Sequence, residues 1–132
     1  MAKTITTWKK GHEFEAEHEG NKIQMDGSTE NGHGPKALLL SALAGCSGID
    51  VVDILTKMKT EFSDFIIEVE ADQTDEHPKV FKDIHIIYKI KTARQNEDKL
   101  RKAIDLSLEK YCGVAAMLKK NSPIDYSIII IE

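Results

Sequence analysis

The sequence lacks the features that mark a disulfide-rich, nucleic-acid-binding or membrane-spanning chain. It contains only two cysteines, three prolines and one tryptophan among 132 residues. Its formal net charge of −4 disfavours a surface for nucleic acid or an anionic membrane, because both require clustered lysine and arginine. No uninterrupted apolar run reaches the roughly 18 residues of a membrane span, and the first residues do not resemble a secretion signal. We therefore expect a cytoplasmic protein whose partner is a small molecule or another protein.

The length and composition predict a single domain, residues 1–132. Hydrophobic residues make up 41% of the chain and charged residues 30%, which is typical of a folded domain rather than a disordered one. A chain of this size buries roughly two thirds of its unfolded surface, which is enough for one core.

Periodicity predicts strands in the first third of the chain and then a long helix. The predicted strands cover residues 4–8, 14–18 and 22–25. After a glycine-rich loop, apolar residues recur at steps of three and four from Lys36 to about Thr60, which predicts a helix. Because residues 37–49 carry no charge, we expect that part of the helix to be buried on all sides.

The second half of the chain alternates strand and helix patterns. Strands are predicted at 65–71, 80–91 and 124–131, and helices at 97–111, capped by Asn96 or Gln95, and at 112–119. The last strand is β-branched and suits a central or a dimer-interface position. This order predicts an α+β fold in which a sheet wraps a long central helix.

Cys46 and Cys112 are the candidate reactive residues. Cys46 lies in the most apolar part of the long helix, and Cys112 opens the last helix, where a helix start lowers the pKa of a thiol. In a reducing compartment a permanent disulfide is disfavoured, whereas a transient one is allowed. The pair can form such a bond if the Cα atoms approach to about 4.4–6.8 Å. The alternative is that both thiols only fill space in the core.

The five histidines give no metal-ligand spacing, so we expect neither a metal nor a cofactor. His12 and His18 lie in an acidic stretch that is expected to be exposed. His33 belongs to a glycine loop that is able to border a pocket. His77 and His85 are expected in a loop and on a sheet face.

The segment from Gly34 to Cys46, G-P-K-A-L-L-L-S-A-L-A-G-C, resembles the motif N-P-E-x-L-L-x-A-x-x-x-x-C of a known family. This is the osmotically inducible protein C and organic hydroperoxide resistance (OsmC/Ohr) family, and Cys112 falls where its second cysteine does. The resemblance spans nearly the whole chain. It implies an OsmC-like fold with a central helix wrapped by antiparallel sheet, in an intertwined homodimer. It also implies that Cys46 attacks a hydroperoxide, that Cys112 resolves the sulfenate as a disulfide, and that a dithiol reduces the product.

Two residues of the family's catalytic site are not in place. Catalytic members carry an arginine on an N-terminal strand, whereas the only arginines here are Arg94 and Arg101. Lys36 stands where they carry a glutamate, at a distance along the helix of roughly 15 Å from Cys46. Possible substitutes for the missing cation are His12, His18, Lys22 and His33.

Three functions are consistent with this pattern. The first is an OsmC-type thiol-dependent hydroperoxide reductase that acts in oxidative-stress defence and favours organic peroxides. The second is a non-catalytic OsmC-fold binding or stress-related protein that has lost the activating residues. The third is a hot-dog-type thioesterase, which also wraps a sheet around a long helix.

Overall fold

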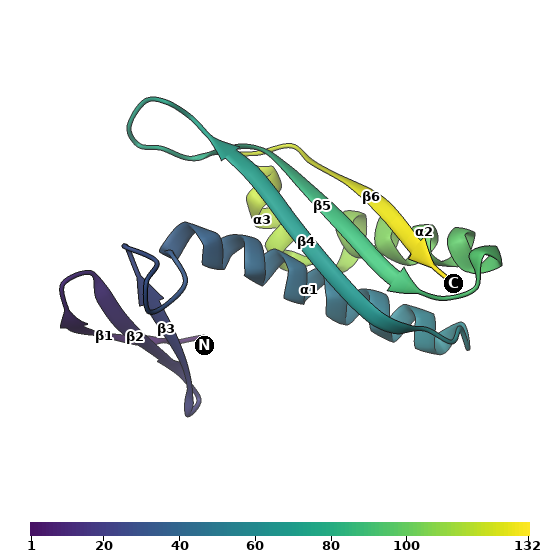
Figure 1. Ribbon diagram of the computed structural model, residues 1–132, viewed down its shortest axis with the longest axis horizontal. Coiled ribbons are helices and arrows are strands. Elements are labelled where there is room, and N and C mark those ends of the chain that lie inside the picture. The colour runs from purple at the N-terminus through teal and green to yellow at the C-terminus, as the bar shows by residue number, and fades with distance from the viewer. The chain divides into compact units, whose positions relative to one another are not determined.

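Figure 1 shows the computed structural model, which describes residues 1–132. The chain divides into two units, Met1–Leu40 and Ser41–Glu132. The α+β class predicted from the sequence is confirmed, with six strands and three α-helices in the predicted order. That the whole chain forms one domain stays a prediction.

The first unit contains an antiparallel three-stranded meander. Its strands are β1 (Ile5–Lys10), β2 (Glu13–His18) and β3 (Asn21–Asp26). The turns form at Gly11 (φ 53°) and Gly20 (φ 84°), conformations that glycine adopts without steric cost. Trp8 faces Phe14 across β1 and β2, and Phe14 faces Met25 across β2 and β3. His12 and His18 are exposed, as predicted.

Asp26 organises the loop that follows β3. Its buried carboxylate accepts backbone N–H hydrogen bonds from Ser28 at 2.8 Å and Asn31 at 3.1 Å. The bond from Ser28 is the largest of the effects that hold the pKa of this carboxyl below its usual range. The Asp26 N–H donates to the His33 carbonyl at 2.9 Å, which returns the loop to β3 before the long helix begins.

Gly32 is the position in this loop that cannot carry a side chain. A Cβ atom at Gly32 would lie 2.7 Å from the Gln24 carbonyl oxygen, whereas one at Gly34 would meet only Thr29, at 3.5 Å. We expect Gly32→Ala to lower the free energy of unfolding by about 1–3 kcal/mol, because backbone must move to accommodate the methyl group. Urea unfolding followed by Trp8 fluorescence measures this loss. Gly34→Ala is the matched control, and equal unfolding midpoints for the two variants would contradict the prediction.

The second unit contains a three-stranded sheet in the order β4-β5-β6. The strands are β4 (Ser63–Gln73), β5 (Phe81–Lys91) and β6 (Ile124–Ile131). Strands β4 and β5 form an antiparallel hairpin, but β6 runs parallel to β5, because the helices between them carry the chain back to the start of the sheet. The sheet is thus not wholly antiparallel, and β6 is an edge strand rather than a central one.

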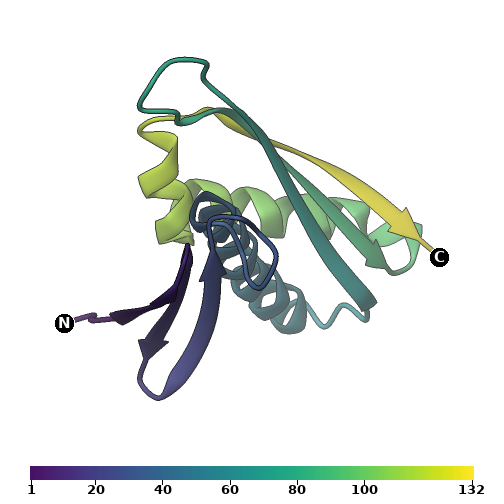
Figure 2. The same cartoon turned by 60° about the vertical axis from the view of Figure 1, so that its left-hand side comes forward.

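The helices of the second unit cover one face of this sheet (Figures 1 and 2). They are the end of α1 (Pro35–Lys57), α2 (Glu97–Leu106) and α3 (Gly113–Lys119), with a 3-10 turn η1 (Arg94–Asn96) and a π-helical turn η2 (Ser107–Tyr111). Alternate residues of β5 and one stripe of each long helix form the core: Ile84, Ile86, Tyr88, Ile90, Leu43, Val51, Leu55, Leu100, Ala103 and Ile104. The opposite face of the sheet carries exposed isoleucines on β4 and β6, namely Ile66, Ile129 and Ile131.

Two features of the helices differ from the prediction. The uncharged half of α1 is not buried on all sides: Ile49 is 66% exposed, because a single chain packs against only one stripe of the helix. Asn96 occupies the N-cap of α2, but its side chain makes no capping bond. It donates instead to the hydroxyl of Thr92 at 3.0 Å.

Helix α1 is also long and apolar enough, by length and composition alone, to cross a membrane. No membrane span was predicted, because small and polar residues such as Ser41, Ser47 and Asp50 interrupt its apolar runs. The core helix of a folded protein meets the same criterion, and Leu43, Val51 and Leu55 of α1 are buried in the core. The composition of α1 is thus only weak support for a membrane span.

Candidate functional site

The second unit brings Cys46 and Cys112 together. Cys46 lies on α1 and is half-buried, whereas Cys112 immediately precedes α3 and is only 3% exposed. Both are free thiols, and Cys46 lies close enough to Cys112 to raise the pKa of its thiol. The two cysteines that the sequence singled out are therefore neighbours, while their catalytic roles stay predictions.

The π-helical turn η2 positions Cys112. The N–H of Cys112 donates to the Ser107 carbonyl at 2.7 Å, a bond that spans five residues instead of the four of an α-helix. Cys112 then leaves the helical conformation and becomes the N-cap of α3, where its Sγ accepts the Ala115 N–H at 3.3 Å. Such π turns are uncommon in proteins and are frequent at functional sites.

Burial raises the pKa of the Cys112 thiol to about 11. The Ala115 N–H bond acts in the opposite direction, whereas Cys46 and the Asp50 carboxylate raise the pKa further. The position of Cys112 at a helix start predicted a lowered pKa, and that prediction is wrong. One N–H bond to the sulfur does not compensate for removing a thiolate from water beside a negative charge.

A buried chain of hydrogen bonds lies beside the cysteines and was not anticipated from the sequence. The Ser47 hydroxyl lies 2.7 Å from the Tyr88 hydroxyl and 2.9 Å from the Ser107 hydroxyl, and Ser107 donates to the Asp50 carboxylate at 3.0 Å. Burial raises the pKa of Tyr88 to about 12, so its phenol stays protonated. The signal in the sequence is the spacing of Ser47 and Asp50, which directly follow Cys46 within one helical turn.

A hollow of about 430 Å³ opens beside Asp50. On α1, Cys46, Asp50 and Lys57 share one face, and Asp50 and Lys57 both line this hollow. Its other walls are mainly apolar: Ile54, Met58, Leu106 and Tyr111, with Asp53 at the edge. A second hollow, of about 510 Å³, lies along the small residues Ala44, Gly45 and Gly48.

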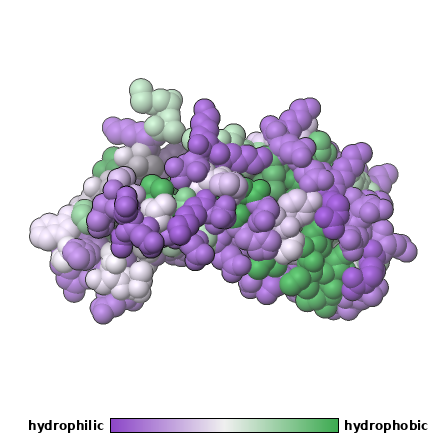
Figure 3. Space-filling model, turned by 90° about the horizontal axis from the view of Figure 1, so that it is seen from above, coloured by the Kyte–Doolittle hydropathy of each residue, from purple (hydrophilic) through white to green (hydrophobic).

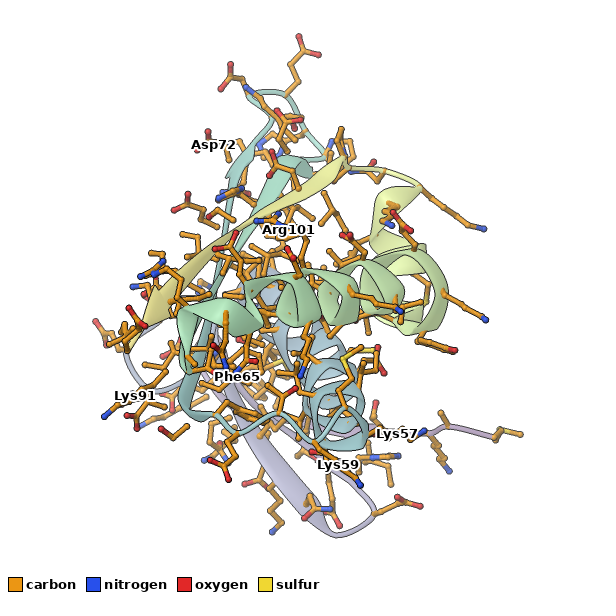
Figure 4. All side chains as sticks on the ribbon, turned by 90° about the vertical axis from the view of Figure 1, so that its right-hand side faces the viewer. Lys57, Lys59, Phe65, Asp72, Lys91 and Arg101 are labelled. Atoms are coloured by element: carbon orange, nitrogen blue, oxygen red, sulfur yellow. The ribbon has the colours of Figure 1, made fainter.

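Both arginines are engaged away from the cysteine pair. Arg94 lies 3.6 Å from the Glu132 carboxylate. Arg101 donates to Glu97 at 3.2 Å and lies over the Tyr126 ring, and Figure 4 shows it between α2 and β6. The charge that acts on Cys112 is therefore the Asp50 carboxylate, the opposite sign to the arginine that the family resemblance leads one to expect.

His85 forms a second polar cluster, on the outward face of the sheet. Its Nδ1 lies 2.6 Å from Asp125 and its Nε2 lies 3.1 Å from the Ser127 hydroxyl, the order of groups found in serine hydrolases. The adjoining hollow is lined by Glu70, Asp72 and Asp83, whose charges oppose the oxyanion that such a reaction develops. These bonds therefore tie β5 to β6, and His85 is a sheet-face residue as predicted.

No group of three or more His, Cys, Asp or Glu side chains in the structure is arranged to hold a metal ion. The polar groups at the cysteine pair instead satisfy one another through the hydrogen bonds described above.

The raised pKa of Cys112 makes stability depend on pH. Its proton is bound more tightly in the folded than in the unfolded chain, so the stabilisation is present below about pH 8.5 and is lost as the pH rises toward 11. Between pH 8 and 10.5 we expect Cys112→Ser to lose about 1–3 kcal/mol less unfolding free energy than the wild type. Urea unfolding under reducing conditions measures both slopes. Identical slopes would show that Cys112 does not contribute in this way.

The comparisons with known proteins agree with the fold. The family model described as OsmC-like protein matches residues 27–127. Protein YhfA of Escherichia coli strain K12 is 36% identical over 127 residues, which cover 94% of each chain. The crystal structure of a hypothetical protein from Aquifex aeolicus VF5 is 30% identical, with a TM-score of 0.85, and covers 100% of this chain and 98% of that one.

More distant solved structures share the fold alone. An OsmC-like protein from Mycoplasma pneumoniae has a TM-score of 0.87 at 16% identity and covers 100% of this chain and 98% of that one. An organic hydroperoxide resistance protein from Elizabethkingia anophelis has a TM-score of 0.68 at 10% identity and covers 99% of this chain and 96% of that one.

Proposed function

Since the chain belongs to the family of OsmC-like proteins, we propose that it reduces organic hydroperoxides with Cys46 and Cys112 as a redox pair. The observation that carries this proposal is the proximity of the two thiols, with an apolar hollow that opens at Asp50, one helical turn from Cys46. The proposed setting is oxidative-stress defence in the cytoplasm. Several relatives of this fold are named for organic hydroperoxide resistance, which supports the same chemistry here.

The exposure of the two thiols supports the roles that we propose for them. Cys46 is half-buried and able to meet a substrate, so its thiolate attacks the terminal peroxide oxygen. The O–O bond breaks, the alcohol leaves with a proton, and Cys46 becomes a sulfenic acid. The buried Cys112 then attacks the Cys46 sulfur, an S–S bond forms and water leaves. An external dithiol returns both thiols and supplies the two electrons.

The walls of the hollow favour an organic peroxide over hydrogen peroxide. Ile54 lies about two turns along α1 from Cys46, Met58 directly follows the end of α1, and Leu106 of α2 lines the same hollow, so all three offer apolar surface. An alkyl or aryl group gains free energy by leaving water for such surface, whereas hydrogen peroxide has no group to place there. Lys57 and Asp53 at the rim keep the entrance polar.

The test is peroxide consumption by the purified protein with a dithiol. We expect turnover of cumene hydroperoxide to exceed that of hydrogen peroxide. Cys46→Ser should abolish turnover, whereas Cys112→Ser should complete one turnover and stop at the sulfenic acid, which a dimedone adduct detects by mass spectrometry. Equal peroxide consumption by the wild type and Cys46→Ser would refute the proposal.

The second candidate is a non-catalytic OsmC-fold binding or stress-related protein. It is favoured by the Asp50 carboxylate beside the cysteines and by the engagement of Arg94 and Arg101 elsewhere. This candidate predicts that the wild type consumes no peroxide in the same assay. The family match leaves the thioesterase alternative without support.

We further propose that the protein is a homodimer. The uncharged stretch of α1 leaves Ile49 66% and Val52 37% exposed, next to small residues that allow another backbone to approach closely. In the first unit Ile5 is 59% and Trp8 62% exposed, which adds apolar surface on β1. Figure 3 shows further apolar surface, coloured green, among hydrophilic side chains. A second copy offers matching apolar surface for each of these faces.

Sedimentation velocity tests the dimer. We expect a species of twice the 14.8 kDa chain mass. Ile49→Glu should shift it toward the monomer, because a carboxylate buried in an apolar interface is strongly unfavourable. Met117→Glu is the matched control, since Met117 is 68% exposed on α3. A wild-type monomer, or equal dissociation of both variants with circular dichroism unchanged, would contradict this proposal.

A further inference from the structure

We propose that Asp50 is the proton acceptor that activates Cys112 when the disulfide closes. This inference rests on the proposed redox pair, but it concerns the second step alone. The carboxylate thus acts where the family resemblance leads one to expect a cation, and on the other sulfur.

The position of Asp50 follows from the helix. Residues four apart in an α-helix lie one above the other, so Asp50 stands one turn from Cys46 on the same face of α1. Ser107 of η2 links Cys112 to this face, because its carbonyl accepts the Cys112 N–H at 2.7 Å and its hydroxyl donates to the Asp50 carboxylate at 3.0 Å. The three groups therefore share one site, with the hollow beside Asp50 as its opening.

The hydrogen-bond chain fixes the carboxylate and leaves it available. Ser107 donates to Oδ2 of Asp50 at 3.0 Å, and Ser107 is itself held by Ser47 at 2.9 Å. Both serines are fully buried, so the Asp50 carboxylate that Ser107 binds cannot rotate freely. The second carboxylate oxygen is left to accept a proton, directly or through one water molecule.

Cys112 needs such an acceptor. A buried thiol whose pKa is about 11 is almost wholly protonated at neutral pH, and only the thiolate attacks a sulfenic acid or a disulfide. A carboxylate beside a thiol disfavours the separated thiolate, yet it is able to take the proton as the new S–S bond forms. The same charge that slows spontaneous ionisation therefore provides the route for the proton.

The step balances without another reactant. The proton leaves Cys112 Sγ for the Asp50 carboxylate while the Cys112 sulfur attacks the Cys46 sulfur. The S–S bond forms, the S–O bond of the sulfenic acid breaks, and the departing hydroxide takes the proton from Asp50 as water. Asp50 thus ends the step as a carboxylate.

Disulfide closure is measurable without peroxide. Reduced protein mixed with 5,5′-dithiobis(2-nitrobenzoate) first releases one thionitrobenzoate as Cys46 forms a mixed disulfide. Attack by Cys112 then releases a second, and Cys112→Ser should show only the first phase. We expect Asp50→Asn to slow the second phase about 100-fold, a typical contribution of a general base, without slowing the first. Asp98→Asn, which changes an exposed carboxylate in the first turn of α2, should match the wild type.

The pH profile separates proton transfer from a structural role. In Asp50→Asn the second phase should rise tenfold per pH unit between pH 7 and 10, whereas the wild type should be much flatter over this range. The other titratable groups that face Cys112 or the hollow are Cys46, Asp53, Lys57, Tyr88 and Tyr111, and Lys119 of α3 donates to the Leu108 carbonyl. These groups are common to both proteins, so they do not produce the difference.

Asp50→Glu keeps a carboxylate and should keep a fast second phase, which guards against a folding defect in Asp50→Asn. A second phase within twofold of the wild type in folded Asp50→Asn would overturn the proposal. Equal loss in the asparagine and glutamate variants would also overturn it, because the carboxylate would then matter only for packing. Neither result depends on peroxide turnover, so a failure of the proposed function remains distinguishable.

Discussion

The hydrogen-bond chain from Tyr88 through Ser47 and Ser107 to Asp50 joins three elements of the second unit at one point. Tyr88 comes from β5, Ser47 and Asp50 from α1, and Ser107 from η2. Tyr88, Ser47 and Ser107 are fully buried, so each hydroxyl must keep its partner or lose the free energy of a satisfied hydrogen bond. A slide of α1 along the sheet would break the chain. Because Cys46 neighbours Ser47 and the π turn links Ser107 to Cys112, the same constraint sets the two sulfurs side by side.

The electrostatics of this site differ from those of an activated thiol. No arginine reaches the cysteines, and burial and Asp50 both favour the protonated form of Cys112. Ionised sulfur is therefore scarce, and chemistry at Cys112 depends on where its proton can go rather than on a standing thiolate. In such a site a fixed carboxylate has two opposing effects: it disfavours the free Cys112 thiolate at equilibrium, and it accepts the thiol proton during the reaction. The second effect operates only while the S–S bond forms, so one residue can have both effects.

The secondary-structure elements that depend on local sequence were predicted, whereas the features that depend on tertiary contacts were missed. Strand β6 was predicted at 124–131 and forms there, because its β-branched run has no helical alternative. The long helix was placed to within three residues at its C-terminal end. The helix predicted from 97 to 111 changes to a π turn at Ser107, because contacts with α1 stabilise that conformation. The pairing of the cysteines was expected, but the pKa of Cys112 depends on burial and on Asp50, which no spacing reveals.

Helix α1 presents three faces, and one chain covers only part of them. Leu43, Val51 and Leu55 enter the core, and Cys46, Asp50 and Lys57 face the site. The third face, with Gly45, Ile49 and Val52, is apolar and exposed. A helix face without charge is unfavourable when it is exposed to water, and in the proposed homodimer a second copy covers this face. Covering it also removes water from the helix that carries Cys46, and in a drier site the interaction between Asp50 and the thiols becomes stronger. Helix α1 thus carries both the apolar face and Cys46 of the proposed redox pair.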